Sequence, residues 1–287
     1  MSDKYVITKS LLDNLNDTIS ERTGETKKRT IPQMGTDVST LSPESSPTKP
    51  GWTNYPEGTN LGTSITEAQL TAIRNGTFEG LGIGDYWVVH DDIYDMDFSL
   101  KIADFDYYYG KGVGNVGDAS DTHHVVIVTA WPWEQYMMDI YGSAECAQYT
   151  DSYLYTYGLN EVRTVISRVV GESHLVNMRK RIVGRDAVEL SYEDTVWTLC
   201  ASNVYGYYGG GPVGGFNPDD TLPFEVFATN TNVRRGRFSP TASAQAFWLT
   251  NFSANSMSSW TQSVDGQIFE QYTQETSEYA VAFLLKG

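Results

Sequence analysis

Three groups of residues in this sequence have side chains or spacings that could do chemistry. Gly112, Gly114 and Gly117 match the GxGxxG pattern of dinucleotide-binding loops. That fingerprint needs a parallel strand before the glycines and a helix directly after them, because the first amides of the helix hold the phosphates. The residues that follow, DASDTHHVVIV, predict a turn and a strand instead. We therefore interpret the glycines as a hairpin loop and predict no nucleotide site.

Acidic residues crowd one short segment, at Asp91, Asp92, Asp95 and Asp97. A helix–loop–helix calcium site needs acids at alternate positions, a central glycine and a distal glutamate. This segment has no central glycine, and Phe98 follows the last acid directly. The pattern favours a solvated acidic hairpin tip over a cation site.

His123 and His124 are adjacent, so in a strand their side chains point to opposite faces and cannot hold one metal ion together. We expect one of them to pack or to hydrogen-bond inside the protein, near Asp104 or Asp106. The chain contains no GxSxG nucleophile motif and no CxxC pair. These patterns predict a protein without catalytic residues, metal ligands or cofactors.

The composition argues against several classes of function. A formal net charge of −16 opposes non-specific binding to nucleic acid, which needs Lys and Arg to neutralise phosphates. No run approaches the roughly 18 apolar residues that span a bilayer. The opening MSDKYVITKSLL lacks the apolar core of a signal peptide. We expect a chain made in a reducing cytoplasm without membrane insertion, with Cys146 and Cys200 as free, buried thiols.

The elements that must position these residues fall into three parts of the chain. Residues 1–41 predict a helical N-terminal anchoring module, which is too small to bury much apolar surface alone. The apolar face of its helix consists of Leu11, Leu12, Leu15 and Ile19. Residues 42–60 are rich in proline and serine and predict a linker. Residues 61–287 predict a β-rich α+β globular domain.

Within the globular domain, residues 82–128 predict half-buried strands in GIGDYWVV, KIADFDYYY and DTHHVVIV. TSITEAQLTAIRNG predicts a helix with a capping box at Thr66 and Gln69, and NEVRTVISRVVG predicts a second helix with one apolar face. PWEQYMMDIYG predicts a further short helix. The Asp265-Gly266 dipeptide between two β-like runs predicts a hairpin.

One segment has the composition of a recognition loop. Tyr205, Tyr207 and Tyr208 lie directly before GGGPVGG, so large aromatic side chains stand beside an adaptable backbone. The segment is also consistent with a loop that covers an aromatic core. We predict that these tyrosines contact a ligand or partner.

Several stretches resemble proteins of tailed phages. ITKSLLDNLNDTISERTGETKKRTIPQM resembles a segment that opens many structural proteins of phages infecting Gram-positive hosts. Beyond the linker, LGTSITEAQLTAIRNGTFEGLGIGDYW, KIADFDYYY and THHVVIV are similar to an uncharacterised phage structural-protein domain. The closing FWLTNFS, VDGQIF and EYAVAFLL are similar to the end of that domain, and this ending also resembles C-type-lectin-like folds.

The resemblance implies a non-enzymatic virion structural protein displayed on the particle surface, as a capsid decoration or head fibre. The anchoring module would bind other virion proteins of the capsid or tail, and homo-oligomers are expected because they multiply weak contacts.

An alternative is a tail or baseplate adhesin for host cell-wall carbohydrate. Its candidate sugar-stacking residues are Trp248, Trp260 and Tyr272. A polysaccharide-degrading virion enzyme is a further alternative, because 36 acidic residues always offer carboxylate pairs.

Overall fold

The computed structural model describes residues 58–110, 121–130, 136–138, 149–183, 189–206, 222–229, 247–252, 258–262, 268–272 and 276–287. The predicted anchoring module, 1–41, lies outside these residues, and so does the predicted linker except for residues 58–60. Also outside them are the predicted anchoring residues Leu11, Leu12, Leu15 and Ile19. The chain divides into two units, Met1–Thr48 and Lys49–Gly287, and the described residues belong to the second.

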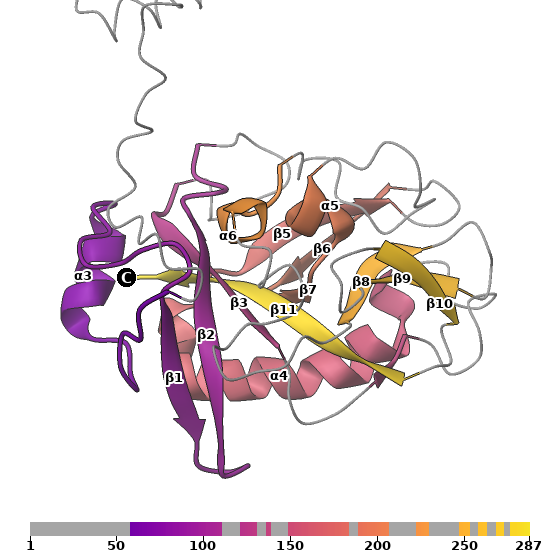
Figure 1. Cartoon of the computed structure of the whole chain (residues 1–287), viewed down its shortest axis with the longest axis horizontal. Helices are drawn as coiled ribbons and strands as arrows, with labels where there is room; N and C mark the ends of the chain where they lie inside the picture. Colours follow the sequence, from indigo (N-terminus) through magenta and orange to yellow (C-terminus); the bar gives the residue numbers. More distant parts are fainter. Residues whose placement is uncertain are drawn as a thin grey trace, which may run out of the picture. The chain divides into compact units, whose positions relative to one another are not determined.

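A nine-stranded, largely antiparallel sheet forms the centre of the described domain (Figure 1). Its strands are β1 (Tyr86–Asp91), β2 (Met96–Phe105), β3 (His124–Ala130), β4 (Tyr136–Met137), β7 (Val196–Thr198), β8 (Phe247–Phe252), β9 (Ser258–Gln262), β10 (Ile268–Tyr272) and β11 (Thr276–Lys286). The main path runs β1-β2-β3-β11-β8-β9-β10, and β4 and β7 pair with β11 outside that path. Among the described strands, only β8 and β11 pair in parallel. A separate two-stranded ribbon consists of β5 (Met178–Val183) and β6 (Glu189–Asp194).

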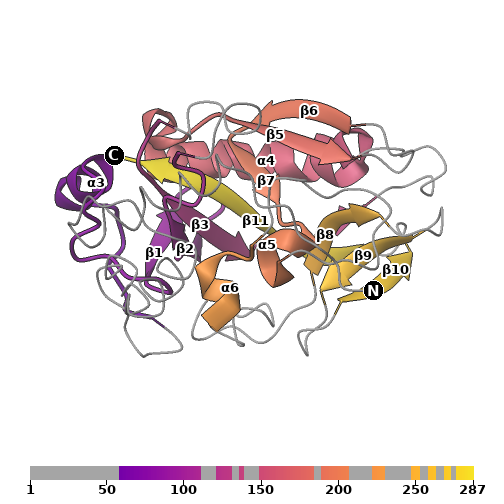
Figure 2. The ribbon, with the colours of Figure 1, turned by 90° about the horizontal axis from the view of Figure 1, so that it is seen from above.

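Helices cover both sides of the sheet. They are α3 (Glu67–Arg74), α4 (Leu159–Ile166), α5 (Ala201–Tyr205) and α6 (Glu225–Thr229). The shorter turns are the π-helical η3 (Leu154–Gly158) and η4 (Ser167–Gly171), which extend α4, and the 3-10 turns η2 (Tyr149–Asp151) and η5 (Glu172–His174). The sheet lies between α4 on one side and α5 and α6 on the other (Figures 1 and 2). The described domain is therefore an α+β fold, as the sequence predicts.

The central strand, β11, joins the two halves of the sheet because its sequence is apolar on both faces. Its residues from Tyr279 to Leu285 are all buried. Residues 280–286 pair with β3, and residues 281–283 also pair with β7 along the opposite edge. A nearly continuous apolar run is typical of a strand that is covered on both faces.

The three strands predicted between residues 82 and 128 are present as β1, β2 and β3, but their burial differs from the prediction. Residues 98–105 of β2 and 124–129 of β3 are all buried. The expectation of half-buried strands is therefore wrong for both, because other elements cover the sheet on each side. The exposed residues of these strands are His90 in β1 and Asp97 near the start of β2.

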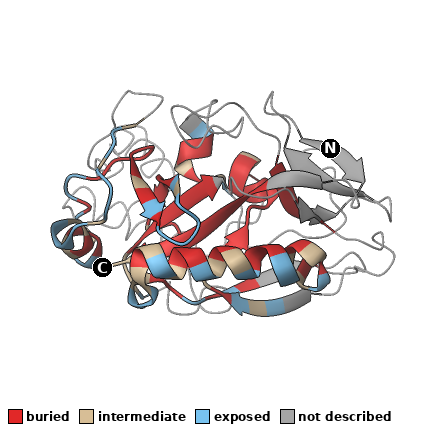
Figure 3. Ribbon diagram, turned by 90° about the horizontal axis from the view of Figure 1, so that it is seen from below, coloured by how far each residue is buried: buried red, intermediate tan, exposed pale blue. Residues whose placement is uncertain are grey.

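Local sequence explains the two longer predicted helices, which are both confirmed. The Thr66 hydroxyl accepts a hydrogen bond from the Gln69 amide at 3.3 Å, and the Gln69 side chain accepts one from the Thr66 amide at 2.9 Å. This capping box starts α3, and Gly76 follows its end with a φ of +64°. α4 buries Val162 and Val165 toward the core and alternates them with exposed residues on its outer face (Figure 3).

Two other local predictions have different outcomes. PWEQYMMDIYG is not the predicted helix at Tyr136–Met137, because these residues form β4 against the start of β11. Pairing with the central strand outweighs weak local helix propensity. The hairpin predicted around Asp265-Gly266 is confirmed by its strands, since Gln262 of β9 lies opposite Ile268 of β10. Within the part of the chain that the structure describes, no helix is both long and apolar enough to cross a membrane.

Candidate functional site

The two ends of β2 each carry a histidine–aspartate pair. Asp97 is the second residue of β2, and Asp106 follows its last residue. His90 of β1 lies directly opposite Asp97 in the strand register. His123 immediately precedes β3 at the other end. At about 3.3 Å per residue the two pairs are roughly 30 Å apart along the strand.

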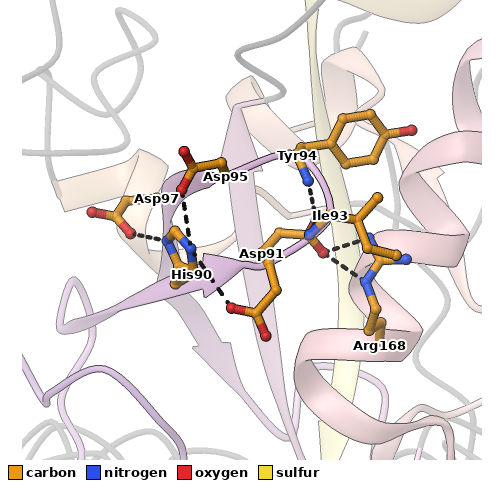
Figure 4. Close-up of polar contacts among 8 residues, drawn as sticks. His90, Asp91, Ile93, Tyr94, Asp95, Asp97 and Arg168 are labelled. Atoms are coloured by element: carbon orange, nitrogen blue, oxygen red, sulfur yellow. Dashed lines mark hydrogen bonds and ion pairs between the residues drawn. The ribbon is translucent and has the colours of Figure 1, made fainter.

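The first pair belongs to the hairpin cluster, which consists of His90, Asp92, Asp95 and Asp97. Figure 4 labels His90, Asp95 and Asp97. Nδ1 of His90 lies 2.9 Å from Oδ1 of Asp97. Its Nε2 lies 3.7 Å from Asp92 and 3.6 Å from Asp95. The hydrogen bond with Asp97 and the nearby carboxylates raise the pKa of His90 above its usual value.

All members of the hairpin cluster face solvent. The side chains of Asp92 and Asp95 are 99% and 96% exposed, and that of His90 is 44% exposed. The solvated acidic tip predicted from the sequence is therefore present. Among the described residues, no group of three or more His, Cys, Asp or Glu side chains could hold a metal ion.

Asp91 departs from that prediction because its carboxylate is buried. Oδ1 accepts hydrogen bonds from the amides of Ile93 and Tyr94 at 3.0 and 2.9 Å. Oδ2 accepts one from Nε of Arg168 at 2.8 Å and another from Nη2 of the same side chain (Figure 4). Burial raises the pKa of Asp91, but the Tyr94 amide and the Arg168 guanidinium outweigh it, and the net pKa is lowered. Asp91 thus closes the β1–β2 turn and fastens it to η4.

The second pair is more enclosed than the first. Nδ1 of His123 lies 2.7 Å from Oδ2 of Asp106, and Oδ1 of the same carboxylate accepts the His124 amide at 2.9 Å. Asp106 has a φ of +51°, in the left-handed region that aspartate adopts more readily than most non-glycine residues. The prediction that a histidine bonds near Asp106 is confirmed, and both histidines take part.

His124 points into the core while His123 points outward. His124 is fully buried, with Nδ1 2.8 Å from the Thr122 carbonyl and Nε2 accepting the Tyr108 amide at 3.3 Å. These partners assign the proton to Nδ1 in a neutral ring. Burial lowers the pKa of His124 and keeps it neutral.

An exposed aromatic ring covers His123. The Tyr109 ring stacks on the imidazole with 4.2 Å between ring centroids and an angle of 15° between planes. Phe78 meets the same imidazole edge-on at 6.4 Å. Gly76 lies so close that a Cβ there would come within 2.5 Å of the His123 ring. We call Asp106, Tyr109 and His123 the Tyr109 surface.

Two further buried aspartates act as ties between distant segments. Asp104 accepts the Glu225 amide at 3.0 Å, which holds the start of α6 against β2. Asp194 binds Arg163 of α4 through both carboxylate oxygens, with Nε to Oδ1 at 2.7 Å. The Arg163 guanidinium also lies over the Tyr155 ring at 4.7 Å. Burial raises the pKa of Tyr155 to about 12, so its hydroxyl stays protonated.

The predicted contact residues occupy different environments. Trp248 of β8 is fully buried, so its ring is part of the core and is not available to stack on a sugar. Tyr205 of α5 is half-buried and packs against the core. Trp260 lies on β9 and Tyr272 on β10, where Tyr272 is opposite Ser258.

The remaining predictions concern the glycine-rich loops and the two cysteines. Tyr207 and Tyr208 lie outside the described residues, as do Gly112, Gly114 and Gly117 of the predicted loop. Cys200 is a free, buried thiol as expected, and Cys146 is outside the described residues.

Sequence reasoning did not find Tyr109, Arg163 or Arg168. The two arginines belong to a helix in which Asn160, Glu161, Thr164 and Ser167 are also polar, so the local sequence carries no signal for their buried acidic partners. None of the protein-family models, curated proteins or solved structures compared with the chain matches it.

Proposed function

We propose that this chain is a non-enzymatic virion structural protein of a tailed phage, displayed on the particle surface as a capsid decoration or head fibre. The observation that carries the proposal is the use of four buried aspartates as ties between segments far apart in the sequence. These aspartates are Asp85, Asp91, Asp104 and Asp194. A display domain needs such rigidity, and the phage resemblance of its sequence motifs supports the same role.

Each tie joins elements that local sequence does not bring together. Asp85 accepts the Thr59 amide at 2.7 Å, across 26 residues. Asp91 reaches Arg168 across 77 residues, and Asp104 reaches Glu225 across 121. Removing one partner from a buried ion pair typically costs about 3–5 kcal/mol. These four aspartates, among the 36 acidic residues of the chain, therefore make structural contacts that support stability.

The role of residues 1–41 as the anchor is tested by deletion. We expect a chain lacking these residues to remain folded but to be missing from purified particles, as measured by immunoblotting after complementation of a phage deleted for the gene. The full-length chain in the same assay is the control. Truncated protein on the particles would contradict the anchoring role, and absence of the full-length chain would contradict the virion role itself.

Antibody labelling of particles decides between head and tail. We expect the label on the capsid. Label on the tail or baseplate would favour the alternative, a receptor-binding adhesin for host cell-wall carbohydrate, and the exposed ring of Tyr109 is the observation that favours this alternative. The C-type-lectin-like character of the closing strands stays a prediction of this proposal.

An enzymatic role has a direct test. We expect no new reducing ends when the protein is incubated with host wall polysaccharide. Their appearance, abolished by a single acidic substitution, would overturn the non-enzymatic proposal. Light scattering tests the expected homo-oligomer, and a strictly monomeric chain would contradict a fibre but not a decoration.

A further inference from the structure

Two polar atoms of the Tyr109 surface have no partner within the described part of the chain. These atoms are Nε2 of His123 and the hydroxyl of Tyr109. Of the two ring nitrogens of His123, Nδ1 is the one that bonds to Asp106. Tyr109 is 44% exposed, and His123 stacks on one face of its ring.

The geometry of the surface is fixed in advance. The carboxylate of Asp106 orients the His123 imidazole, and the same carboxylate accepts a hydrogen bond from the His124 amide. Gly76 and Phe78 close the sides of the His123 ring. A site whose groups are already oriented loses little conformational entropy on binding.

The free groups specify the chemistry of the ligand. In the neutral ring of His123, Nε2 accepts a hydrogen bond because Nδ1 donates to Asp106, and in the protonated ring Nε2 donates. A hydroxyl group matches either form, since it both donates and accepts. The Tyr109 ring adds a flat apolar face with a negative quadrupole, which attracts polarised C–H groups. Both oxygens of Asp106 already accept hydrogen bonds, and the negative charge of the chain disfavours an anionic ligand.

We propose that Tyr109 and His123, positioned by Asp106, bind a neutral saccharide. The C–H face of a pyranose ring stacks on Tyr109, and a ring hydroxyl bonds to Nε2 of His123. This site goes beyond the structural role proposed above and does not depend on it, because antibody labelling of particles can succeed where sugar binding fails.

Nuclear magnetic resonance of the full chain tests the site. The chain has only four histidines, so single substitutions assign the Hε1 signal of His123. The probes are the methyl glycosides of glucose, galactose and N-acetylglucosamine at millimolar concentration. We expect at least one of them to shift the His123 signal in a saturable way.

Two substitutions distinguish binding at this site from non-specific binding to other exposed tyrosines. Tyr109→Ala should weaken binding by about tenfold, because it removes the stacking face. Tyr157→Ala is the matched control, because Tyr157 is 58% exposed and its ring lies 4.7 Å from that of Tyr153 in a comparable pair. Tyr157→Ala should leave the affinity unchanged.

The outcomes either support or overturn the site. Binding that Tyr109→Ala weakens more than Tyr157→Ala supports it. Three glycosides that leave the His123 signal unmoved would overturn it, as would equal losses in the two variants. Circular dichroism of Tyr109→Ala checks that a loss of binding is not a loss of fold.

Discussion

His90 and His123 each hold one aspartate through Nδ1, at 2.9 and 2.7 Å, at opposite ends of β2. The pair at the hairpin tip stands among exposed carboxylates, where solvent screens most of its attraction. The pair beside β3 lies under the Tyr109 ring, and a second hydrogen bond, from His124, fixes its aspartate. Similar hydrogen-bond lengths therefore do not imply equal rigidity. The number of independent contacts on the carboxylate and the ring decides how firmly each pair is held.

The comparison extends to the acids beside His90, where the largest effect is expected. Asp91→Ala should lower the free energy of unfolding by about 3–5 kcal/mol. The substitution leaves the Arg168 guanidinium without its carboxylate partner and removes the hydrogen bond that holds the β1–β2 turn. Urea denaturation measures this change. Asp92→Ala, at a side chain that is 99% exposed, should change it by less than about 0.5 kcal/mol. Similar losses of unfolding free energy in the two variants would show that the burial of Asp91 does not make it more important for stability than Asp92.

Packing against His123 is tested at Gly76. Gly76→Ala should cost about 2–3 kcal/mol, because its φ of +64° strains alanine and its Cβ would approach the His123 ring within 2.5 Å. Gly80→Ala is the matched control, with a φ of +76° and open space around the new Cβ, and should cost about 1 kcal/mol. Denaturation curves of both variants give the difference. Equal losses of stability in Gly76→Ala and Gly80→Ala would mean that the His123 ring moves aside without cost.

The two aspartates of the pairs should differ in the same direction. Asp106→Asn keeps the positive φ, which asparagine tolerates, but weakens the bond to His123, and we expect a loss of about 1–2 kcal/mol. Asp97→Asn at the hairpin should give no measurable change in unfolding free energy. If Asp97→Asn proves as costly as Asp106→Asn, the contrast between the two ends of β2 is wrong.

The smallest effect is a pH dependence whose sign differs between two histidines. Burial depresses the pKa of His124, so its contribution to stability is complete above the unfolded value of about 6.5 and is lost as pH falls below it. The pKa of His90 is raised, so its contribution is complete below about 6.5 and is lost as pH rises through the raised value.

Buried His124 should dominate this balance. We expect stability to fall by roughly 1 kcal/mol per pH unit just below pH 6.5, from urea denaturation across that range. His124→Gln should flatten the slope, and His90→Gln should leave it. A slope that vanishes in His90→Gln would reverse the assignment.

The parts of this structure that local sequence determines could be predicted. Thr66 and Gln69 are three residues apart, and the capping box that they form at the start of α3 depends on these local residues alone. The link between His123 and Asp106 was also within reach, because a hairpin returns the chain to the same place. Arg168 and Asp91 are 77 residues apart, and only the packing of η4 against the hairpin brings them together.

Burial was the least predictable property of the candidate site. Trp248 has the kind of aromatic side chain that stacks on sugars, yet it is buried on β8, where it pairs with β11. Tyr109 is one of three consecutive tyrosines, of which Tyr107 and Tyr108 are buried and only Tyr109 is exposed. Sequence periodicity does not show which ring faces outward, because that depends on where the chain leaves β2.

The place of β11 has a kinetic consequence. The pair of this ladder that is closest in sequence is Ala280 and Ala130, so the chain must close a loop of about 150 residues before any hydrogen bond between the two strands compensates for the lost entropy. Folds dominated by such distant pairings assemble slowly, on a scale of about milliseconds to seconds. Until that step, β3 and β8 would present open edges to other molecules. Newly made copies are therefore most exposed to aggregation before this strand docks.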